Sequence, residues 1–201
     1  VAGPALILKD GSYQTGSAGF RVSPYSGFIY FSLLFKILPL PFAKGLYIDQ
    51  KRYHNCDGPV MVGWLSGACF LVRSSVIREV GGWDESFFMY AEDVELSDRI
   101  TDAGWKIAYL PQVRVLHHHG ASSTHMEIPN TKWLITLFQF IRSKRGNTEY
   151  LIFRSFAVAG AVIRLCVYFS LYIFTFDKKW RKKTRELQFY FKAALTGKEP
   201  S

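Results

Sequence analysis

The chain has 201 residues, of which 49% are hydrophobic and 16% aromatic, enough to bury a core in one domain with appendages. Its three cysteines, Cys56, Cys69 and Cys166, are odd in number and far apart. This pattern argues against a disulfide scaffold and against a zinc finger, and it is consistent with a reducing cytoplasm.

The positive charge of the chain is concentrated in one segment. The formal net charge is +9, and residues 142–185 hold eleven Lys or Arg against Glu149 and Asp177. The rest of the chain holds fourteen basic and fourteen acidic residues and is neutral overall. An excess placed in this way predicts a local anionic partner for the tail rather than a generally basic protein.

The first forty residues predict a strand, a turn and one apolar helix. Residues 5–8 are apolar and predict a strand, and Asp10-Gly11 is typical of a two-residue hairpin turn. Residues 15–27 are rich in Gly and Ser and predict a loop. Residues 28–40 are strongly apolar and predict a buried helix, which is too short to span a bilayer.

Residues 60–62 predict a strand that enters a turn at residues 64–68. In this turn Gly67 permits a close backbone approach to a ligand, and Trp64 offers a flat face for a sugar ring. The alternative is a Trp in the core beside a Gly in a turn. Residues 69–72 are predicted to continue as a buried strand.

A double glycine separates the next two predicted helices. Ser74 or Ser75 is expected to cap a short helix over residues 76–80, and Gly81-Gly82 is expected to end it. Glycine frees the backbone from the usual φ restriction, so the pair also predicts a tight turn into the stretch that follows.

A second helix is predicted after Tyr90, to about residue 103. Leu96 and Ile100 are four residues apart and should face the core. Glu95 and Arg99 are also four apart, and we expect them to pair along the helix surface, worth only about 0.2–0.5 kcal/mol.

Glu92 and Asp93 stand at the start of this helix. Acidic side chains in a first turn are favoured by the helix dipole, by up to about 1 kcal/mol, so ordinary helix-start chemistry is one interpretation. The other is a carboxylate at the lip of an aromatic pocket, available as a general base. The pocket would be built from Trp83, Phe87, Phe88 and Tyr90. Spacing alone favours the first interpretation.

Residues 105–109 and 113–116 predict two strands, and the second ends in His117-His118-His119. Side chains alternate along a strand, so His117 and His119 should face one way and His118 the other. On spacing alone, an exposed polar strand end is favoured over a metal ligand.

The tail begins with an apolar helix predicted at residues 133–141, followed by a polar break. Residues 151–176 form a long apolar run that contains Arg154 and Arg164. A central Arg costs a spanning helix about 2.5–3.5 kcal/mol, so a full span is possible but not favoured.

A basic aromatic cluster at residues 178–183 follows the apolar run and suits anionic lipid headgroups. We therefore expect residues 126–201 to form a membrane-associated helical tail that lies on, or dips into, the cytoplasmic face of the cell membrane. The alternative is an amphipathic helix pair packed on protein, with a solvated run of charge.

Three motifs occur in order over residues 1–125 and carry a family resemblance. The first is Gly63-Trp64-Leu65-Ser66-Gly67-Ala68, and the second is the stretch 81–99. The third is Ala108-Tyr109-Leu110-Pro111 with Val115-Leu116-His117 and Gly120-Ala121-Ser122. Together they resemble the acceptor-side half of a family 2 glycosyltransferase, especially the bacterial rhamnosyltransferase-type members.

The resemblance implies an α/β fold in which residues 1–125 form the C-terminal half of a GT-A mixed sheet with flanking helices. Residues 126–201 would follow as the membrane-associated helices. The chain begins at Val1 inside a strand, and we find neither an Asp-x-Asp motif nor a phosphate loop in it. We therefore expect the nucleotide-binding N-terminal half of the enzyme to lie outside this sequence.

The resemblance also implies transfer of a sugar, with rhamnose as one candidate, from a nucleotide-diphosphate donor with inversion. Asp93 would be the general base, and Glu92 would orient the acceptor or the sugar. Mg²⁺ or Mn²⁺ would neutralise the leaving diphosphate, with His117 as one of its ligands. The remaining residues implied on the substrate side are Trp64, Ser66, Gly67, Trp83, Asp84 and Glu85.

The expected partners are the nucleotide-sugar donor, a saccharide or lipid-linked acceptor in cell-surface polysaccharide assembly, and an anionic membrane surface. No nucleic acid is expected.

Two rival functions stay open. A carbohydrate hydrolase needs two carboxylates about 5–10 Å apart across the sugar, which the adjacent Glu92 and Asp93 do not supply. A non-catalytic membrane-binding or nucleic-acid-binding module would use only the basic tail.

Overall fold

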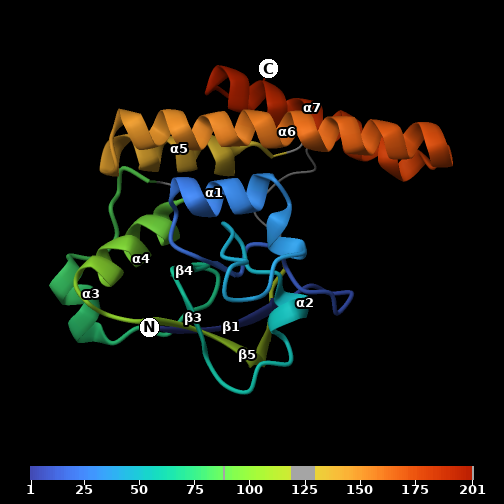
Figure 1. Cartoon of the computed structure of the whole chain (residues 1–201). Coiled ribbons are helices and arrows are strands. Elements are labelled where there is room, and N and C mark those ends of the chain that lie inside the picture. The colour runs from blue at the N-terminus through green and yellow to red at the C-terminus, as the bar shows by residue number, and fades with distance from the viewer. Residues whose placement is uncertain (88, 119–129, 201) are drawn as a thin grey trace.

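The computed structural model describes residues 1–87, 89–118 and 130–200. A small sheet lies on one side of the molecule, and a layer of three long helices lies on the other (Figure 1). Helix α1 (Pro24–Phe31) lies beneath the helical layer, while α3 (Ser74–Val80) and α4 (Glu92–Asp102) flank the sheet. The mixed α/β arrangement expected from the sequence is confirmed.

The main sheet has the strand order β1 (Ala2–Ile7), β5 (Ile107–Leu116), β3 (Val60–Val62). Strand β1 is parallel to β5, and β3 is antiparallel to it. The two strands predicted at 105–109 and 113–116 are one strand, β5. Its pairing with β1 shifts register after Leu110, so the ladder resumes at Arg114 and Pro111 needs no hydrogen bond to β1.

The turn predicted at Asp10-Gly11 is confirmed. Gly11 has a φ of 77°, and the Leu8 amide donates to the Ser12 carbonyl oxygen at 2.8 Å. The returning segment meets β1 again, because the Gln14 amide donates to the Leu6 carbonyl oxygen at 2.9 Å. The hairpin therefore places Gln14 beside the end of β1.

The segment after the hairpin differs from the prediction. Residues 15–27 are not one loop, because they contain β2 (Ala18–Gly19), paired with β4 (Trp64–Leu65), and the start of α1. Ser23 caps α1 through a reciprocal hydrogen-bond pair with Ser26. The buried helix predicted at 28–40 is also wrong. Leu33 adopts a left-handed φ of 65°, which ends the helical path before the short turn η1 (Leu34–Lys36).

Two further predictions near α3 are corrected. Residues 69–72 are not a buried strand, since a single bridge to Ala2 joins Leu71 to the sheet and its side chain is 77% exposed. Helix α3 begins at Ser74 after an extended Arg73 that makes no side-chain cap. The predicted end at Gly81 is confirmed, and its left-handed φ is 79°. The remaining short helix, α2 (Gln50–Tyr53), precedes β3.

Helix α4 has the predicted bounds to within a residue, and Leu96 and Ile100 are buried as expected. The Glu95–Arg99 pair exists, with Arg99 Nη2 2.7 Å from Glu95 Oε2. It does not lie on the surface, because the Glu95 side chain is only 1% exposed. Lys144 Nζ, 3.0 Å from Glu95 Oε1, is a second cation beside this buried carboxylate.

The helical layer consists of α5 (Lys132–Lys144), α6 (Asn147–Thr175) and α7 (Lys178–Thr196). The apolar helix predicted at 133–141 and the break after it are confirmed. The layer shares one core cluster with the front of the chain, in which Trp64 and Ala91 pack with Phe138 and Phe153. The boundary proposed at residue 125 lies outside the described residues.

Gly160 sets the approach of α6 to α1. A Cβ atom at this position would lie 2.5 Å from the Phe31 Cβ and 2.6 Å from its carbonyl oxygen. We expect Gly160→Leu to lower the free energy of unfolding by about 1–3 kcal/mol, because the helices cannot separate without losing the core contact. Urea unfolding measures this, and Ala159→Leu, one residue away on the exposed side, should change stability by less than about 0.5 kcal/mol.

Candidate active site

The candidate site forms around the first turn of α4. Tyr90 and Ala91 precede the helix, and both have left-handed φ values, 65° and 63°. Neither is glycine, so each costs of order 1 kcal/mol and is held by its surroundings. Ala91 is buried in the core, and its carbonyl oxygen accepts from the Glu95 amide at 2.8 Å. This kink presents Glu92 and Asp93 at the helix start.

Asp93 is a half-buried carboxylate held by backbone amides. Its Oδ2 accepts from the Gly67 amide at 3.1 Å, and its Oδ1 accepts from the Val94 amide at 2.8 Å. Burial, and then the charge of Glu92, raise the pKa of Asp93 to about 6, against the lowering effect of the amide donors. A carboxylate of this kind can accept a proton near neutral pH.

Gly67 and Trp83 border this carboxylate. A Cβ atom at Gly67 would lie 3.7 Å from Trp83 Cη2 and 3.9 Å from Asp93 Cβ. The Trp83 side chain is 48% exposed and is tilted against Phe70. Gly67 and Trp83, which the resemblance placed on the substrate side, therefore lie beside Asp93, the implied base, and the indole offers an accessible aromatic face next to the acid.

Glu92 lies next to Asp93 with an unsatisfied oxygen. Its Oε2 is buried and has no hydrogen-bond partner among the described residues, and burial raises the pKa of Glu92. A buried polar atom without a partner is costly, so a ligand that donates to it would be favoured.

Ser66 has a structural contact. Its amide donates to the Ser17 carbonyl oxygen at 2.9 Å, and this hydrogen bond fixes the turn that carries Gly67.

The Asp84 side chain makes structural contacts with Ser86 and Lys144. Its Oδ1 accepts from the Ser86 amide and hydroxyl, and its Oδ2 lies 3.1 Å from Lys144 Nζ. The Ser86 hydrogen bonds, with help from Lys144, lower the pKa of Asp84 to about 2. Glu85 is exposed beside it. Asp84 therefore ties the Trp83 loop to the end of α5.

The sugar platform predicted at Trp64 is wrong. The side chain is 5% exposed, and its Nε1 donates to the Leu46 carbonyl oxygen at 3.1 Å. Tyr47 packs edge-on against the indole with ring centroids 5.5 Å apart. Trp64 is thus a core residue, because β4 pairs with β2 and places the ring beneath the site rather than in it.

The aromatic pocket predicted around Asp93 forms in part. Phe87 packs into the core against Phe140, and Phe88 lies outside the described residues. The Tyr90 hydroxyl accepts a hydrogen bond from the Asn130 side-chain amide. Tyr47 was missed by sequence reasoning. It is partly buried, and its pKa is raised by burial first, then by Tyr30 and by the charge of Asp93; its sequence neighbourhood carries no signal for this.

His117 follows β5 at the edge where β1 also ends. Its amide donates to the Ile7 carbonyl oxygen at 2.9 Å, and its Nδ1 lies 2.5 Å from Gln14 Oε1. The predicted His119 and Gly120-Ala121-Ser122 lie outside the described residues. Among the residues described, no three His, Cys, Asp or Glu side chains are placed to hold a metal ion. These residues alone therefore do not complete a Mg²⁺ site.

His117 is linked to the Asp93 turn through a series of hydrogen bonds that begins at Gln14. The Gln14 carbonyl oxygen accepts from the Ser17 hydroxyl at 2.9 Å, and the Ser17 carbonyl oxygen accepts from the Ser66 amide. Gly67, the next residue, donates to Asp93. The two predicted site elements thus belong to one hydrogen-bonded framework.

Comparison with known proteins finds relatives of this chain. Residues 50–136 match the family described as glycosyltransferase like family 2. The chain is 51% identical over 74 residues to an N-acetylglucosaminyl-diphospho-decaprenol L-rhamnosyltransferase of Mycobacterium tuberculosis, which covers 37% of this chain and 24% of that protein. It is 31% identical over 105 residues to the rhamnosyltransferase WbbL of Escherichia coli, which covers 52% of this chain and 40% of that protein.

A third relative is the O-antigen biosynthesis protein RfbC of Myxococcus xanthus, 38% identical over 135 residues, 66% of this chain and 10% of that protein. The chain thus spans well under half the length of these relatives. No solved structure matches it. The matched segment contains Gly67, Trp83, Asp93 and His117. Residues 50–136 therefore match glycosyltransferase like family 2, and the chain is rhamnosyltransferase-like over the segments that it shares with these relatives.

Proposed function

We propose that this protein is part of a glycosyltransferase that moves a sugar from a nucleotide-diphosphate donor to a saccharide or lipid-linked saccharide in cell-surface polysaccharide assembly. The proposal takes rhamnose as the first candidate sugar, from the printed names of the relatives. Residues 1–125 would form the acceptor-side half of a GT-A domain. The observation that carries the proposal is the half-buried Asp93 carboxylate, with a pKa of about 6, between Gly67 and the exposed Trp83.

Asp93 would act as the general base. An acceptor hydroxyl oxygen attacks the anomeric carbon, the bond from that carbon to the diphosphate breaks, and the hydroxyl proton passes to Asp93. One displacement at carbon gives inversion. Trp83 would carry the apolar face of the acceptor sugar, and the unpartnered Glu92 Oε2 would accept a sugar hydroxyl.

Mg²⁺ or Mn²⁺ remains part of the proposal, with His117 as one ligand. The other ligands would have to come from residues outside those described. When bound, such an ion would stabilise negative charge on the departing diphosphate as a Lewis acid. The role of this chain would then be to hold the imidazole, and the contact between His117 Nδ1 and Gln14 Oε1 supports that orientation.

The rival functions have less support from the geometry. Hydrolysis needs two carboxylates on opposite sides of a sugar, but Glu92 and Asp93 follow each other in one helical turn. A third acid, Glu95, is buried with Arg99 and Lys144. A carboxylate with a raised pKa beside an unpartnered acid is typical of a functional site, which favours the enzyme over a purely binding module.

The direct test is a transfer assay with the full-length protein, a panel of nucleotide-diphosphate sugars, and a lipid-linked saccharide acceptor. Turnover of one donor, dependent on Mg²⁺ or Mn²⁺ and lost in Asp93→Asn, supports the proposal. Failure with every donor, or equal turnover by wild type and Asp93→Asn, contradicts it.

The transfer rate should depend on pH through Asp93. The group must be ionised to accept a proton, so kcat/KM should fall on the acid side with a midpoint near pH 6. Glu92→Gln removes the like charge that helps raise the pKa of Asp93, so the midpoint should move to lower pH. An acid limb that stays in place in Glu92→Gln would assign the titration to another group.

A further inference from the structure

The two arginines within the apolar run of α6 make hydrogen bonds to other helices of the protein. Arg154 donates from Nε to the Ala194 carbonyl oxygen at 2.8 Å and from Nη2 to the Leu195 carbonyl oxygen, at the end of α7. Arg164 donates to the carbonyl oxygens of Phe31, at 3.1 Å, and Tyr30, at the end of α1. Both cations therefore cap the C-terminal carbonyl groups of neighbouring helices.

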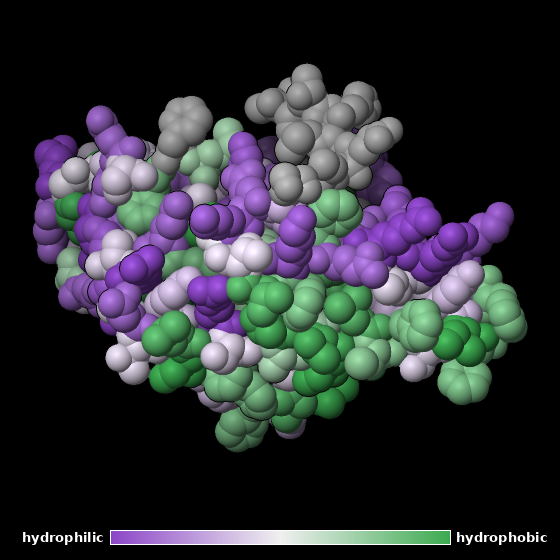
Figure 2. Space-filling model, turned by 90° about the horizontal axis from the view of Figure 1, so that it is seen from above, coloured by the Kyte–Doolittle hydropathy of each residue, from purple (hydrophilic) through white to green (hydrophobic). Residues whose placement is uncertain are grey.

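With its arginines turned inward, α6 presents an uncharged apolar face outward. Among the described helices, α6 is the one long and apolar enough to cross a membrane, and 17% of its apolar window is buried. Figure 2 shows the face as a continuous hydrophobic area. Its exposed large residues are Leu151, Ile152, Val162, Ile163, Val167, Phe169, Ile173 and Phe174. A contiguous patch of this kind marks an interaction surface.

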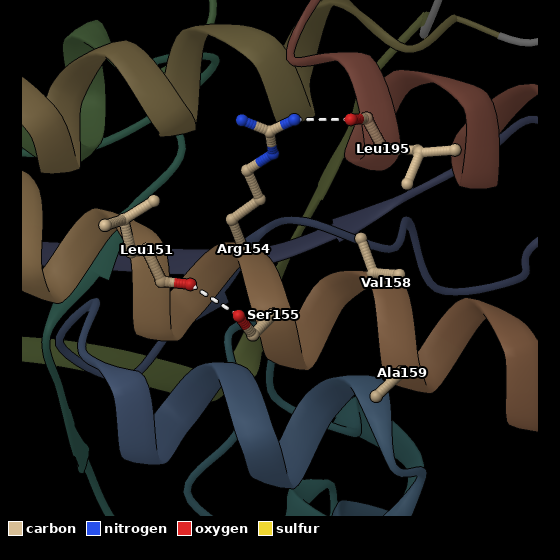
Figure 3. Close-up of a pocket in the computed structure, with 6 residues that line it drawn as sticks. All are labelled: Leu151, Arg154, Ser155, Val158, Ala159 and Leu195. Atoms are coloured by element: carbon tan, nitrogen blue, oxygen red, sulfur yellow. Dashed lines mark hydrogen bonds between the residues drawn. The ribbon is translucent and has the colours of Figure 1, made fainter.

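A shallow hollow of about 340 Å³ opens between α6 and the end of α7 (Figure 3). Its polar groups already have partners: Ser155 Oγ donates to the Leu151 carbonyl oxygen at 2.8 Å, and Arg154 donates to α7. The rest of the lining is apolar and comes from Leu151, Val158 and Leu195. The hollow therefore extends the apolar surface of α6 and is separate from the Asp93 site.

Helix α7 runs back along α6 and carries a basic row. Arg154 meets residue 194 and Tyr168 meets Trp180, with ring centroids 5.5 Å apart, so the two helices are antiparallel. The α7 sequence holds seven Lys or Arg and one Glu. Arg181 and Lys182 are exposed, and Figure 2 shows a hydrophilic band beside the hydrophobic area.

We infer that the α6–α7 pair docks in the plane of an anionic lipid bilayer, with the outer face of α6 in the headgroup–acyl boundary and α7 against the headgroups. Charge complementarity selects this partner, since the cytoplasmic leaflet carries negative charge. An apolar row beside a basic row along one helix pair is the arrangement of an interfacial element. A perpendicular span would take the basic residues near Tyr168 into hydrocarbon, because α7 is packed on α6 there.

The docked layer adjoins the candidate site. The Asn130 side-chain amide donates to the Tyr90 hydroxyl, and the Tyr190 hydroxyl of α7 donates to the Asn130 carbonyl oxygen at 3.3 Å. Tyr90 lies three residues before Asp93. If the proposed function holds, docking would place the base beside the membrane that carries a lipid-linked acceptor, but membrane binding itself does not depend on that function.

Binding is tested by co-sedimentation of the full chain with phosphatidylcholine vesicles, with and without phosphatidylglycerol, and with no sugar donor present. We expect binding to the anionic vesicles only. Arg181→Glu with Lys182→Glu should weaken it by about thirty-fold or more. Lys9→Glu with Lys51→Glu makes the same change in net charge on exposed residues away from α7 and should leave binding within about twofold.

The apolar face is tested by Phe169→Asp, which should weaken binding by at least about tenfold. Leu71→Asp introduces the same charge at an exposed apolar residue on the other side of the fold and should have little effect. Circular dichroism of each variant confirms that it is folded.

Orientation is tested by depth-dependent quenching of a probe on single cysteines, in a Cys56→Ser, Cys69→Ser background. Cys166 is exposed on α6, and Ile152→Cys and Ile173→Cys supply two more positions in a Cys166→Ser chain. Docking in the plane predicts similar shallow depths for all three. A span predicts depths that differ by up to about 31 Å between residues 152 and 173, and would overturn the inference.

Two other results would overturn it as well. One is equal binding to neutral and anionic vesicles. The other is binding of a single-stranded oligonucleotide that responds to Arg181→Glu with Lys182→Glu but not to Phe169→Asp, while the vesicles do not bind. That result would assign the basic row to nucleic acid.

Discussion

Replacing Asp93 with asparagine should abolish sugar transfer and at the same time stabilise the fold at pH 7. The loss in kcat should be about 10²–10⁴-fold, because asparagine cannot accept the proton. The amide oxygen of asparagine can still accept the hydrogen bond from Gly67, but its NH₂ group cannot accept the one that Asp93 Oδ1 takes from the Val94 amide. The change therefore removes the charge together with one of the two amide contacts, and the lost contact offsets part of the gain in stability.

The gain in stability follows from the direction of the pKa change. Burial and Glu92 raise the pKa of Asp93 from 3.8 to about 6, so the folded state binds the proton more tightly than the unfolded state. Wild-type stability should therefore fall as pH rises from about 4 through about 6. Above that window the ionised group costs the folded state about 1–3 kcal/mol, which Asp93→Asn removes.

Denaturant unfolding at pH 4 and pH 7, with transfer assays on the same preparations, measures both effects. Asp84→Asn is the matched control, because the pKa of Asp84 is lowered to about 2 and its ionised form is stabilised by Ser86 and Lys144. That variant should lose stability at pH 7 rather than gain it. Retained transfer by Asp93→Asn would contradict the assignment of Asp93 as the base. A stability difference from wild type that is no more favourable at pH 7 than at pH 4 would contradict the raised pKa.

Replacing Glu95 with alanine should lower the free energy of unfolding by about 2–3 kcal/mol, because the hydrogen bonds that this buried carboxylate accepts from charged groups are lost and a cavity is left. Glu95 is 1% exposed and pairs with both Arg99 and Lys144, whose side chains are 29% and 38% exposed. Arg99 also donates to the carbonyl oxygens of Val80 and Gly82, so the variant should loosen the loop that carries Trp83.

Urea unfolding checks this value, and Asp102→Ala is its control on the same helix. Asp102 pairs with Arg21, but its side chain is 58% exposed, so its loss should cost less than about 1 kcal/mol. Glu95→Gln keeps an acceptor for Arg99 and should fall between the two. Equal, small effects of Glu95→Ala and Asp102→Ala would show that the buried charge cluster contributes little.

Several features of the fold and site could be predicted from residues alone, because they depend on short-range backbone preferences. Asp10-Gly11 makes its turn, and Gly81 ends α3, since glycine adopts a left-handed φ without a Cβ clash. The start of α4 at Glu92 and Asp93 follows from helix-dipole chemistry. The meeting of Gly67 with the Trp83 loop and Asp93 was implied by family resemblance and not by spacing.

Tertiary packing decided which of these side chains are exposed and which residues they contact. Sequence spacing pairs Glu95 with Arg99, but only the arrival of Lys144 from α5 makes that pair part of the interior. Trp64 has the same indole whether it faces a sugar or the core, and the pairing of β4 with β2 places it in the core. Arg164 would oppose membrane contact on an isolated helix, yet the end of α1 binds its charge. In each case a residue distant in sequence supplies the partner, and local preference carries no information about which distant segment will pack there.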